Sequence, residues 1–331
     1  MTTQRETAVA GAGLTVVPLA PDAALPVRRW RRPSGKILTG LIILGIFVLV
    51  AIIGPFVAPY DPSQISTAIL APPSAAHLLG TTQTGQDVLS QLLVGARSTL
   101  IVGFVAGAVA TVLSVLVGVS SGYFGGTGGE ALSLVSNVFL VIPALPLLVA
   151  LLSYLPQANV WVIALIISVT GWAWGARVLR AQTLALRKRD FVQAAKAAGE
   201  RSWRIIVSEI LPNEAAVVAT SFLFTVLYAV LFYAGLVFLG LANINEWSWG
   251  TVLYFAQNNQ ALSVGAWWWF VPPGVCIALV GTALSLLNFG VDDLINPRLR
   301  AAGLRRRAFR ELGGDQGITP VSRRRTVREQ G

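Results

Sequence analysis

The sequence predicts an all-α polytopic membrane protein, a bundle of six transmembrane helices. Hydrophobic residues make up 54% of the 331 residues, and charged residues make up only 12%. The charges are also segregated, because five long stretches carry none. Each stretch is long enough for one span of about 20 apolar residues, and the third is long enough for two. The uncharged stretches are 37–60, 98–129, 131–176, 215–245 and 247–291.

The third stretch is expected to turn at 154–159, where a proline and two amides separate two apolar blocks. The six expected helix cores are therefore 37–58, 98–121, 131–152, 160–178, 215–240 and 267–289. Prolines inside two of these cores predict kinks, because proline removes a helical hydrogen bond. They are Pro143, Pro146, Pro272 and Pro273.

The formal net charge of +10 is concentrated beside the expected helices. Basic residues cluster before the first helix, between the fourth and fifth, and after the last, at 28–36, 177–204 and 298–310. The positive-inside rule places all three clusters in the cytoplasm. Six spans agree with this placement, since an even number puts both termini on one side. The charge is thereby explained without nucleic acid, and we expect no nucleic-acid partner.

Glycines four residues apart recur in the expected helices and allow close helix crossings. The pairs are Gly103 and Gly107, Gly118 and Gly122, and Gly171 and Gly175. We favour ordinary packing over a moving gate, because glycine is common in membrane helices.

Five tryptophans lie near the start of the last expected helix, at positions 247, 249 and 267–269. We interpret them as an aromatic belt at the outer membrane interface. A stacking surface at a translocation mouth or partner contact is the alternative.

The sequence offers little for catalysis or metal binding. One histidine, His77, and one cysteine, Cys276, exclude a disulfide framework and a His/Cys metal cluster within this chain. No carboxylate or cation pair lies near mid-membrane to couple transport to an ion, and no G-x-x-x-x-G-K-[ST] phosphate loop is present. We therefore expect a non-catalytic chain with no metal and no cofactor of its own, whose energy source lies on another subunit. A channel that uses only backbone dipoles remains open.

A short polar interlude between the fourth and fifth helices predicts a helix that docks on a partner. Starting at Asp190, one aromatic residue and three alanines fall at i, i+3, i+4 and i+7, on one stripe of the helix. They are Phe191, Ala194, Ala195 and Ala198. Asp190 with Gln193 resembles a capping box, and Gly199 falls where a left-handed C-terminal turn is expected. A helix of about two turns needs a surface to pack on. An interfacial connector between two spans is the alternative.

The same loop resembles the cytoplasmic loop of bacterial ABC importer permeases. Its pattern is E-A-A, three residues, G, and then I-x-L-P. Gln193, Ala194, Ala195, Gly199 and the pair Leu211-Pro212 fall in register with it. Gln193 replaces the usual glutamate, and Glu209 stands at the isoleucine position.

A second motif resembles the C-type subunit of the dipeptide/oligopeptide/nickel permease family. The family pattern H-x-L-G-T, G-R-D-V-x-S, G-A-R-x-S-L matches the segments 77–81, 85–90 and 95–100, with Gln86 and Thr99 as departures. The matching positions include His77, Gly80, Thr81, Gly85, Asp87, Ser90 and Arg97. The resemblance covers residues 35–300.

The resemblance implies the fold of a type I ABC importer permease in the bacterial cytoplasmic (inner) membrane. Residues 1–35 and 301–331 would be cytoplasmic tails, and 36–300 the permease domain with a coupling loop at 180–213. Its implied partners are the lipid bilayer, a second homologous permease, two cytoplasmic ATP-binding subunits that hold ATP and Mg, and an extracytoplasmic solute-binding protein. The substrate would be a peptide or a related small solute, and the 190–199 helix would couple to the ATPases. A stand-alone channel or facilitator and a membrane scaffold are the alternatives.

Overall fold

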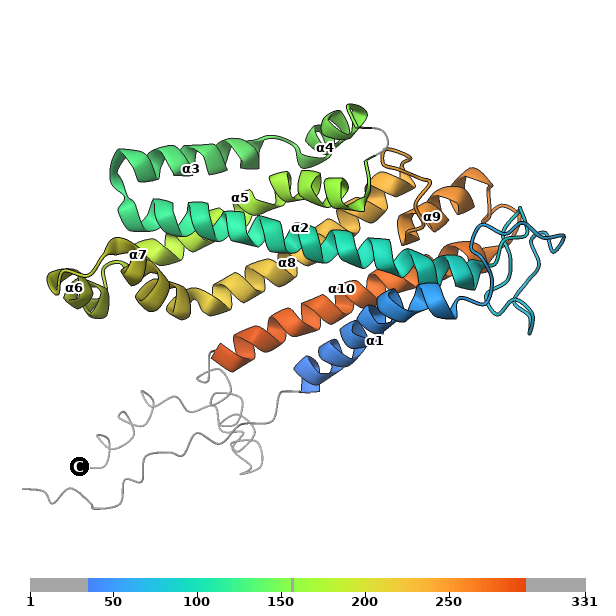
Figure 1. The fold of residues 1–331 in the computed structure, drawn as a ribbon, viewed down its shortest axis with the longest axis horizontal. Helices are drawn as coiled ribbons and strands as arrows, with labels where there is room; N and C mark the ends of the chain where they lie inside the picture. The colour runs from blue at the N-terminus through green and yellow to red at the C-terminus, as the bar shows by residue number, and fades with distance from the viewer. Residues whose placement is uncertain (1–34, 156–157, 296–331) are drawn as a thin grey trace, which may run out of the picture. The chain divides into compact units, whose positions relative to one another are not determined.

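The computed structural model describes residues 35–155 and 158–295, and these residues are mostly helical, with one long connection, 58–87, between the first two helices (Figure 1). They contain no strand, only one isolated bridge between Thr81 and Asp87. The helices are α1 (Gly35–Val57), α2 (Val88–Phe124), α3 (Gly126–Val141), α4 (Ala144–Ser153), α5 (Val160–Leu186), α6 (Asp190–Ala197), α7 (Ser202–Arg204), a π-helix (Ile205–Ile210), α8 (Leu211–Phe238), α9 (Trp249–Asn258) and α10 (Trp267–Ile295). The predicted all-α class is confirmed.

Five helical segments within the described residues are each long and apolar enough to cross a membrane: α1, α2, α5, α8 with its preceding turns, and α10. The pair α3 and α4 meets the same criterion when taken together, and would make a sixth span. The number and order of the predicted spans therefore agree with the structure. The two expected tails, 1–35 and 301–331, lie outside the described residues except for Gly35, which begins α1.

The third span is broken rather than merely kinked. Its two halves, α3 and α4, are bent by 86° relative to each other. Pro143 lies at the break in extended conformation and precedes α4 directly. The expected kink at Pro143 is confirmed, because proline lacks the N–H that would continue the helical ladder. By contrast, α10 runs through Pro272 and Pro273 without interruption, so a break there is not observed.

Other boundaries differ from the expected cores. Helix α2 begins at Val88, ten residues before the expected position, because Asp87 accepts a hydrogen bond from the Ser90 backbone and caps the helix. Helix α5 continues to Leu186 and so includes basic residues that were expected to lie in a loop. The short helix α9 was not predicted.

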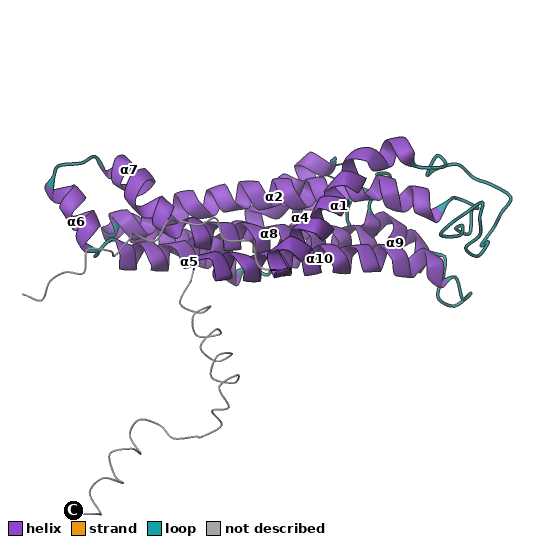
Figure 2. Ribbon diagram, turned by 90° about the horizontal axis from the view of Figure 1, so that it is seen from below, coloured by secondary structure: helices purple, strands orange, loops and turns teal. Residues whose placement is uncertain are grey.

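Helix α2 occupies the centre of the bundle and packs closely against α5 and α8 (Figures 1 and 2). A Cβ atom added to Gly118 would lie 2.5 Å from the Ala176 carbonyl oxygen of α5. One added to Gly122 would lie 2.7 Å from the Cβ atom of Thr183. These glycines allow close backbone approach, as predicted.

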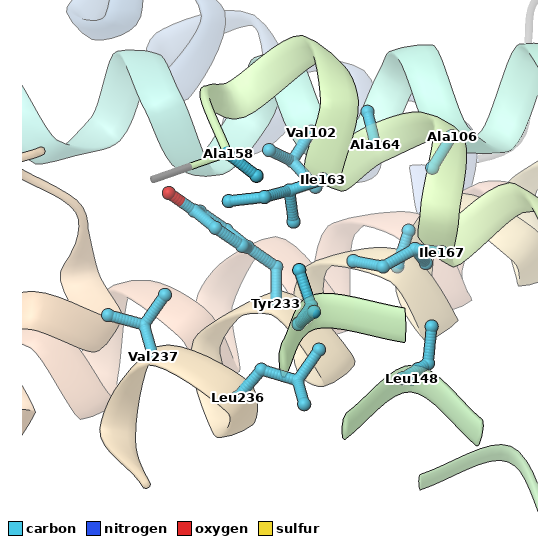
Figure 3. Packing of buried hydrophobic residues seen from close by; sticks show 12 residues of the cluster. Val102, Ala106, Leu148, Ala158, Ile163, Ala164, Ile167, Tyr233, Leu236 and Val237 are labelled. Atoms are coloured by element: carbon cyan, nitrogen blue, oxygen red, sulfur yellow. The ribbon is translucent and has the colours of Figure 1, made fainter. Parts of the chain in front are cut away.

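The largest cluster of buried apolar residues joins α2, α4, α5 and α8. Figure 3 shows Tyr233 of α8 lying among Ile163, Val102 and Ala158, with its hydroxyl group pointing toward Ala158. Leu148 brings α4 into the same cluster. The broken third span is thereby held against the bundle.

The belt interpretation is wrong for two of the five tryptophans. Trp249 is 1% exposed, and its indole N–H donates to the Leu92 carbonyl oxygen at 3.1 Å. Trp269 is 2% exposed. Trp268 is half-buried and donates to the Thr81 carbonyl oxygen, whereas Trp267 is exposed. Most of the cluster fixes the outer ends of the helices to one another.

We predict that Gly118→Ala lowers the melting temperature of the purified protein. The added methyl group meets backbone atoms of α5 that cannot rotate away, and such overpacking costs about 1–3 kcal/mol. Gly45→Ala in α1 is the matched control, since nothing lies within 4 Å of the added atom there. Equal melting temperatures of the two variants in a fluorescence melt would contradict the proposed close crossing.

Candidate functional site

The eight-residue helix α6 lies in the connection between α5 and α8, as the sequence predicted. Its start differs by one residue from the expectation. Arg189, in extended conformation, is the N-cap, and no side chain caps the helix. Asp190 is the first helical residue, and its negative charge there still interacts favourably with the helix dipole. The capping-box prediction is wrong, because the Gln193 amide donates to the Arg187 carbonyl oxygen at 2.8 Å instead.

The end of α6 is as predicted. Gly199 has φ +76°, which only glycine adopts at little cost. Its N–H donates to the Lys196 carbonyl oxygen at 3.0 Å, and the Glu200 N–H donates to the Ala195 carbonyl oxygen at 3.1 Å. These two bonds form a Schellman motif, which ends the helix and turns the chain back toward the bundle.

The predicted stripe of α6 is divided between two faces. Phe191 is 39% exposed, and Ala194 and Ala198 are exposed as well. Ala195, however, packs inward beside the fully buried Val192, which sequence reasoning did not single out. Val192 and Ala195 stand three residues apart and therefore share the inner face. The outward stripe consists of Phe191, Ala194 and Ala198.

The inner face of α6 packs on the end of the bundle where α2 and α5 finish. Val192 belongs to a buried cluster whose members come from α2, α5, α6 and the π-helix: Val119, Tyr123, Leu179, Val192, Ile205 and Ile210. Lys196 adds a cation–π contact, with its ammonium nitrogen 4.9 Å from the centre of the Tyr123 ring. Helix α6 therefore rests on α2 as well as on its own flanking segments.

Arg187 ties the end of α5 to the end of α2. Its Nη1 atom donates to the Tyr123 carbonyl oxygen at 3.0 Å and to that of Gly122 at 3.4 Å. The last carbonyl groups of a helix have no partner within it, so a cation there supplies missing hydrogen bonds and favours the helix dipole. The segment that leads into α6 is thus fixed on both sides.

A buried carboxyl group lies where α8 begins. Glu214 is 1% exposed, and its Oε1 atom accepts a hydrogen bond from the Thr183 hydroxyl of α5 at 2.8 Å. Its Oε2 atom is buried without a hydrogen-bond partner in the structure. Sequence reasoning did not single out Glu214. Directly before α8 the chain forms a π-helix, an element that frequently occurs at functional sites.

The outer-loop motif builds a compact structure around the start of α2. The His77 Nδ1 and Asp87 Oδ1 atoms are 3.0 Å apart, and Asp87 Oδ2 accepts from both the backbone and the hydroxyl group of Ser90. Gly80 and Gly85 have φ +69° and +73°, respectively. The residues described contain no group of three side chains suited to a metal ion. This part of the motif folds the loop and caps α2.

Two further motif residues have separate roles. The Thr81 hydroxyl accepts from the Ala71 backbone and donates to the Ala68 carbonyl oxygen, so it fixes the two sides of the loop. Arg97 does not join the cluster. It lies ten residues into α2, is exposed, and borders a groove between α1 and α2.

Comparisons with known proteins agree with this architecture. Residues 114–301 match the family described as the binding-protein-dependent transport system inner membrane component. Residues 37–73 match the N-terminal transmembrane domain of oligopeptide transport permease C. The chain belongs to this permease family. The permease thus has the helical architecture that its sequence predicted, and its family is one of transport subunits.

Curated relatives of the permease are peptide transport proteins. It is 32% identical to the oligopeptide transport system permease protein OppC of Mycobacterium tuberculosis, over 85% of this chain and 97% of that protein. It is 34% identical to the dipeptide transport system permease protein DppC of Bacillus subtilis, over 85% of this chain and 88% of that protein. A solved structure of the MetNI methionine ABC transporter aligns with 61% of this chain and 94% of the other, at 20% identity and a TM-score of 0.47.

A second carboxyl group with a buried oxygen lies at the opposite end of the permease, in the connection between α8 and α9. Glu246 Oε2 is buried without a hydrogen-bond partner. Burial raises the pKa of this carboxyl group, while a hydrogen bond from the Val160 backbone N–H acts in the opposite direction. Its own backbone carbonyl accepts from the Thr251 hydroxyl at 2.7 Å. The loop is therefore anchored to both α5 and α9.

We predict that the stability of the permease falls less steeply with rising pH in the Glu246→Gln variant than in the wild type. Because the folded-state pKa is raised, the protonated form is favoured in the fold, and its stabilisation is lost as the pH rises through that pKa. The glutamine variant should therefore melt above the wild type at pH 7, with the difference shrinking toward pH about 4, near the ordinary range of glutamate. Melting curves between these limits provide the measurement. Glu209→Gln, at a partly exposed position in the π-helix, is the control; equal effects of both variants would refute the assignment.

Proposed function

We propose that this permease forms half of the translocation path of an ATP-driven importer and that α6 transmits movement from cytoplasmic ATPases. The observation that carries this proposal is the outward stripe of Phe191, Ala194 and Ala198 on a helix whose inner face is firmly packed. Small residues allow a partner to approach closely, and one aromatic side chain provides an anchor. A rigid base allows force on the stripe to reach the spans.

The proposed substrate is a peptide or a related small solute. This proposal is supported by the relatives, which are named as oligopeptide and dipeptide permeases. The partners would be a second homologous permease, two cytoplasmic ATP-binding subunits and an extracytoplasmic solute-binding protein. ATP and Mg would bind to the ATPase subunits, and this chain would hold no cofactor. A stand-alone channel or a scaffold would require none of these subunits for its activity.

The coupling proposal predicts that Ala194→Glu abolishes ATPase co-purification or uncouples ATP turnover from substrate in reconstituted vesicles. A charge buried against a partner without a counter-charge costs several kcal/mol. The variant should still fold, because Ala194 is exposed in this chain. Ala185→Glu, an identical change at an exposed position of α5, should couple normally. Normal coupling in a well-expressed Ala194→Glu variant would leave α6 as a simple connector.

The proposed orientation places both termini and α6 in the cytoplasm of a bacterial inner-membrane protein. Single-cysteine variants in a Cys276→Ala background test it. An impermeant thiol reagent should label Ser263→Cys in intact cells, and Ser202→Cys only after permeabilisation. Both positions are exposed, so lack of access to the thiol would not confuse the result. Labelling of Ser202→Cys in intact cells would overturn the orientation.

A further inference from the structure

An apolar groove of about 400 Å³ lies between α1 and α2, with Trp161 of α5 on its border. Its lining is formed by Val48, Ala51, Ile52, Phe56, Arg97, Leu100, Ile101, Phe104, Val105 and Trp161. Phe56 is 83% exposed and Ile52 is 62% exposed, so the groove opens at the surface of the described bundle. Helix α1 packs mainly on α2 and α10, which leaves its other faces uncovered.

Arg97 is the only ionisable residue that lines this groove. The three helices that form the groove contain no aspartate or glutamate at all. None of the ion pairs or side-chain hydrogen bonds within the described residues involves Arg97. A cation beside apolar surface without an ion-pair partner in the chain is available to bind an anion from elsewhere, and ionisable residues in membrane segments commonly mark function.

The position of Arg97 along the helices indicates the depth of this charge. Helix α1 has 23 residues and is therefore about 34 Å long, close to the thickness of the hydrocarbon core. Arg97 borders the groove together with Ile52 and Phe56, in the last two turns of α1. The guanidinium group thus lies near one edge of the hydrocarbon layer, at the level of lipid phosphates. Val48 and Phe104 line the groove toward the membrane centre.

The hydrogen-bonding groups of the groove fit a ligand that only accepts hydrogen bonds, and they do not fit a peptide. Its polar side-chain atoms belong to Arg97 and to the indole N–H of Trp161, and both side chains are donors only. A peptide would bring its own backbone N–H groups, which would find no acceptor among the apolar side chains. A phosphodiester accepts hydrogen bonds, and an acyl chain requires none.

We propose that this groove binds an anionic glycerophospholipid, with its phosphate on Arg97 and one acyl chain along the apolar side chains between α1 and α2. Trp161 lies on the border of the groove, and its ring adds apolar surface with a single N–H donor. The bound lipid would cover the seam between the peripheral helix α1 and the central helix α2. The proposal goes beyond the transport function and does not depend on the identity of the substrate.

Lipid retention tests the headgroup contact. The full-length permease, with any subunits that co-purify, is placed in nanodiscs of phosphatidylcholine with a minority of phosphatidylglycerol, and retained lipid is measured by native mass spectrometry. Arg97→Gln should lower phosphatidylglycerol retention about tenfold, as expected for the loss of charge-assisted hydrogen bonds. Arg97→Lys should retain most of the binding. Arg177→Gln removes an exposed charge elsewhere and should change nothing.

Photo-crosslinking identifies the occupant of the apolar part. A photoreactive amino acid at Ile101 should give an adduct with the mass of a phospholipid. An adduct with another protein chain or with a peptide would overturn the proposal, as would equal phosphatidylglycerol retention by the wild type and Arg97→Gln. If the reconstituted wild-type assembly retains lipid normally but does not transport, the result would count against the proposed function alone. The two failures are therefore distinguishable.

Discussion

The close crossing of α2 with α5 is the constraint on which the rest of the structure depends. Gly118 and Gly122 remove the side chains that would otherwise hold the two backbones apart. The approach brings Arg187 within reach of the α2 carbonyl groups, and it places Thr183 against Gly122. Neither contact would form between helices separated by larger side chains. The support of α6 therefore begins at this crossing, since Val119 and Tyr123, on which α6 rests, directly follow the two glycines.

Helix α2 connects the two ends of the permease as one continuous element. At one end Asp87 caps it within the folded outer loop, and Trp249 donates to the Leu92 carbonyl oxygen. At the other end Tyr123 contacts Lys196 of α6. A 37-residue helix without internal proline is about 55 Å long and resists bending. Under the proposed function, movement at α6 is thus passed to a stiff element whose far end bears on the outer loop.

Local sequence signals predicted those features that depend on local physics. Long apolar stretches located the spans, Pro143 located the break, and Gly199 located a turn that requires positive φ. Each outcome depends on a property of the residues themselves. Apolar stretches favour the hydrocarbon core, proline lacks a backbone donor, and glycine lacks a side chain. The outer-loop residues were singled out by the family resemblance rather than by a local signal, and Arg97 does not join the others around the start of α2.

Features that depend on tertiary contacts could not be predicted in the same way. The alanines of α6 give no contrast between faces, so only Val192 could have indicated that Ala195 turns inward. The short helix α9 is held by packing of Trp249, although Ser248 at its N-cap offered a local signal. The pairing of Thr183 with Glu214 joins residues 31 positions apart, and nothing in either segment specifies it.

The hydrogen bond between Thr183 and Glu214 also distinguishes two regions of the α5–α8 contact. Toward the membrane centre the contact is mainly apolar, with one hydrogen bond between the hydroxyl groups of Thr170 and Tyr228, and separating it would expose hydrophobic surface. Near α6 it combines apolar packing around Leu179 with one hydrogen bond to a buried carboxyl group whose second oxygen has no donor. A buried oxygen without a donor is costly, and that cost falls as soon as water or a new donor reaches it. Opening in this region is therefore partly compensated, whereas opening nearer the centre is not. Under the proposed function, displacement of α6 would separate α5 and α8 first at Glu214 while the apolar core above it stays closed.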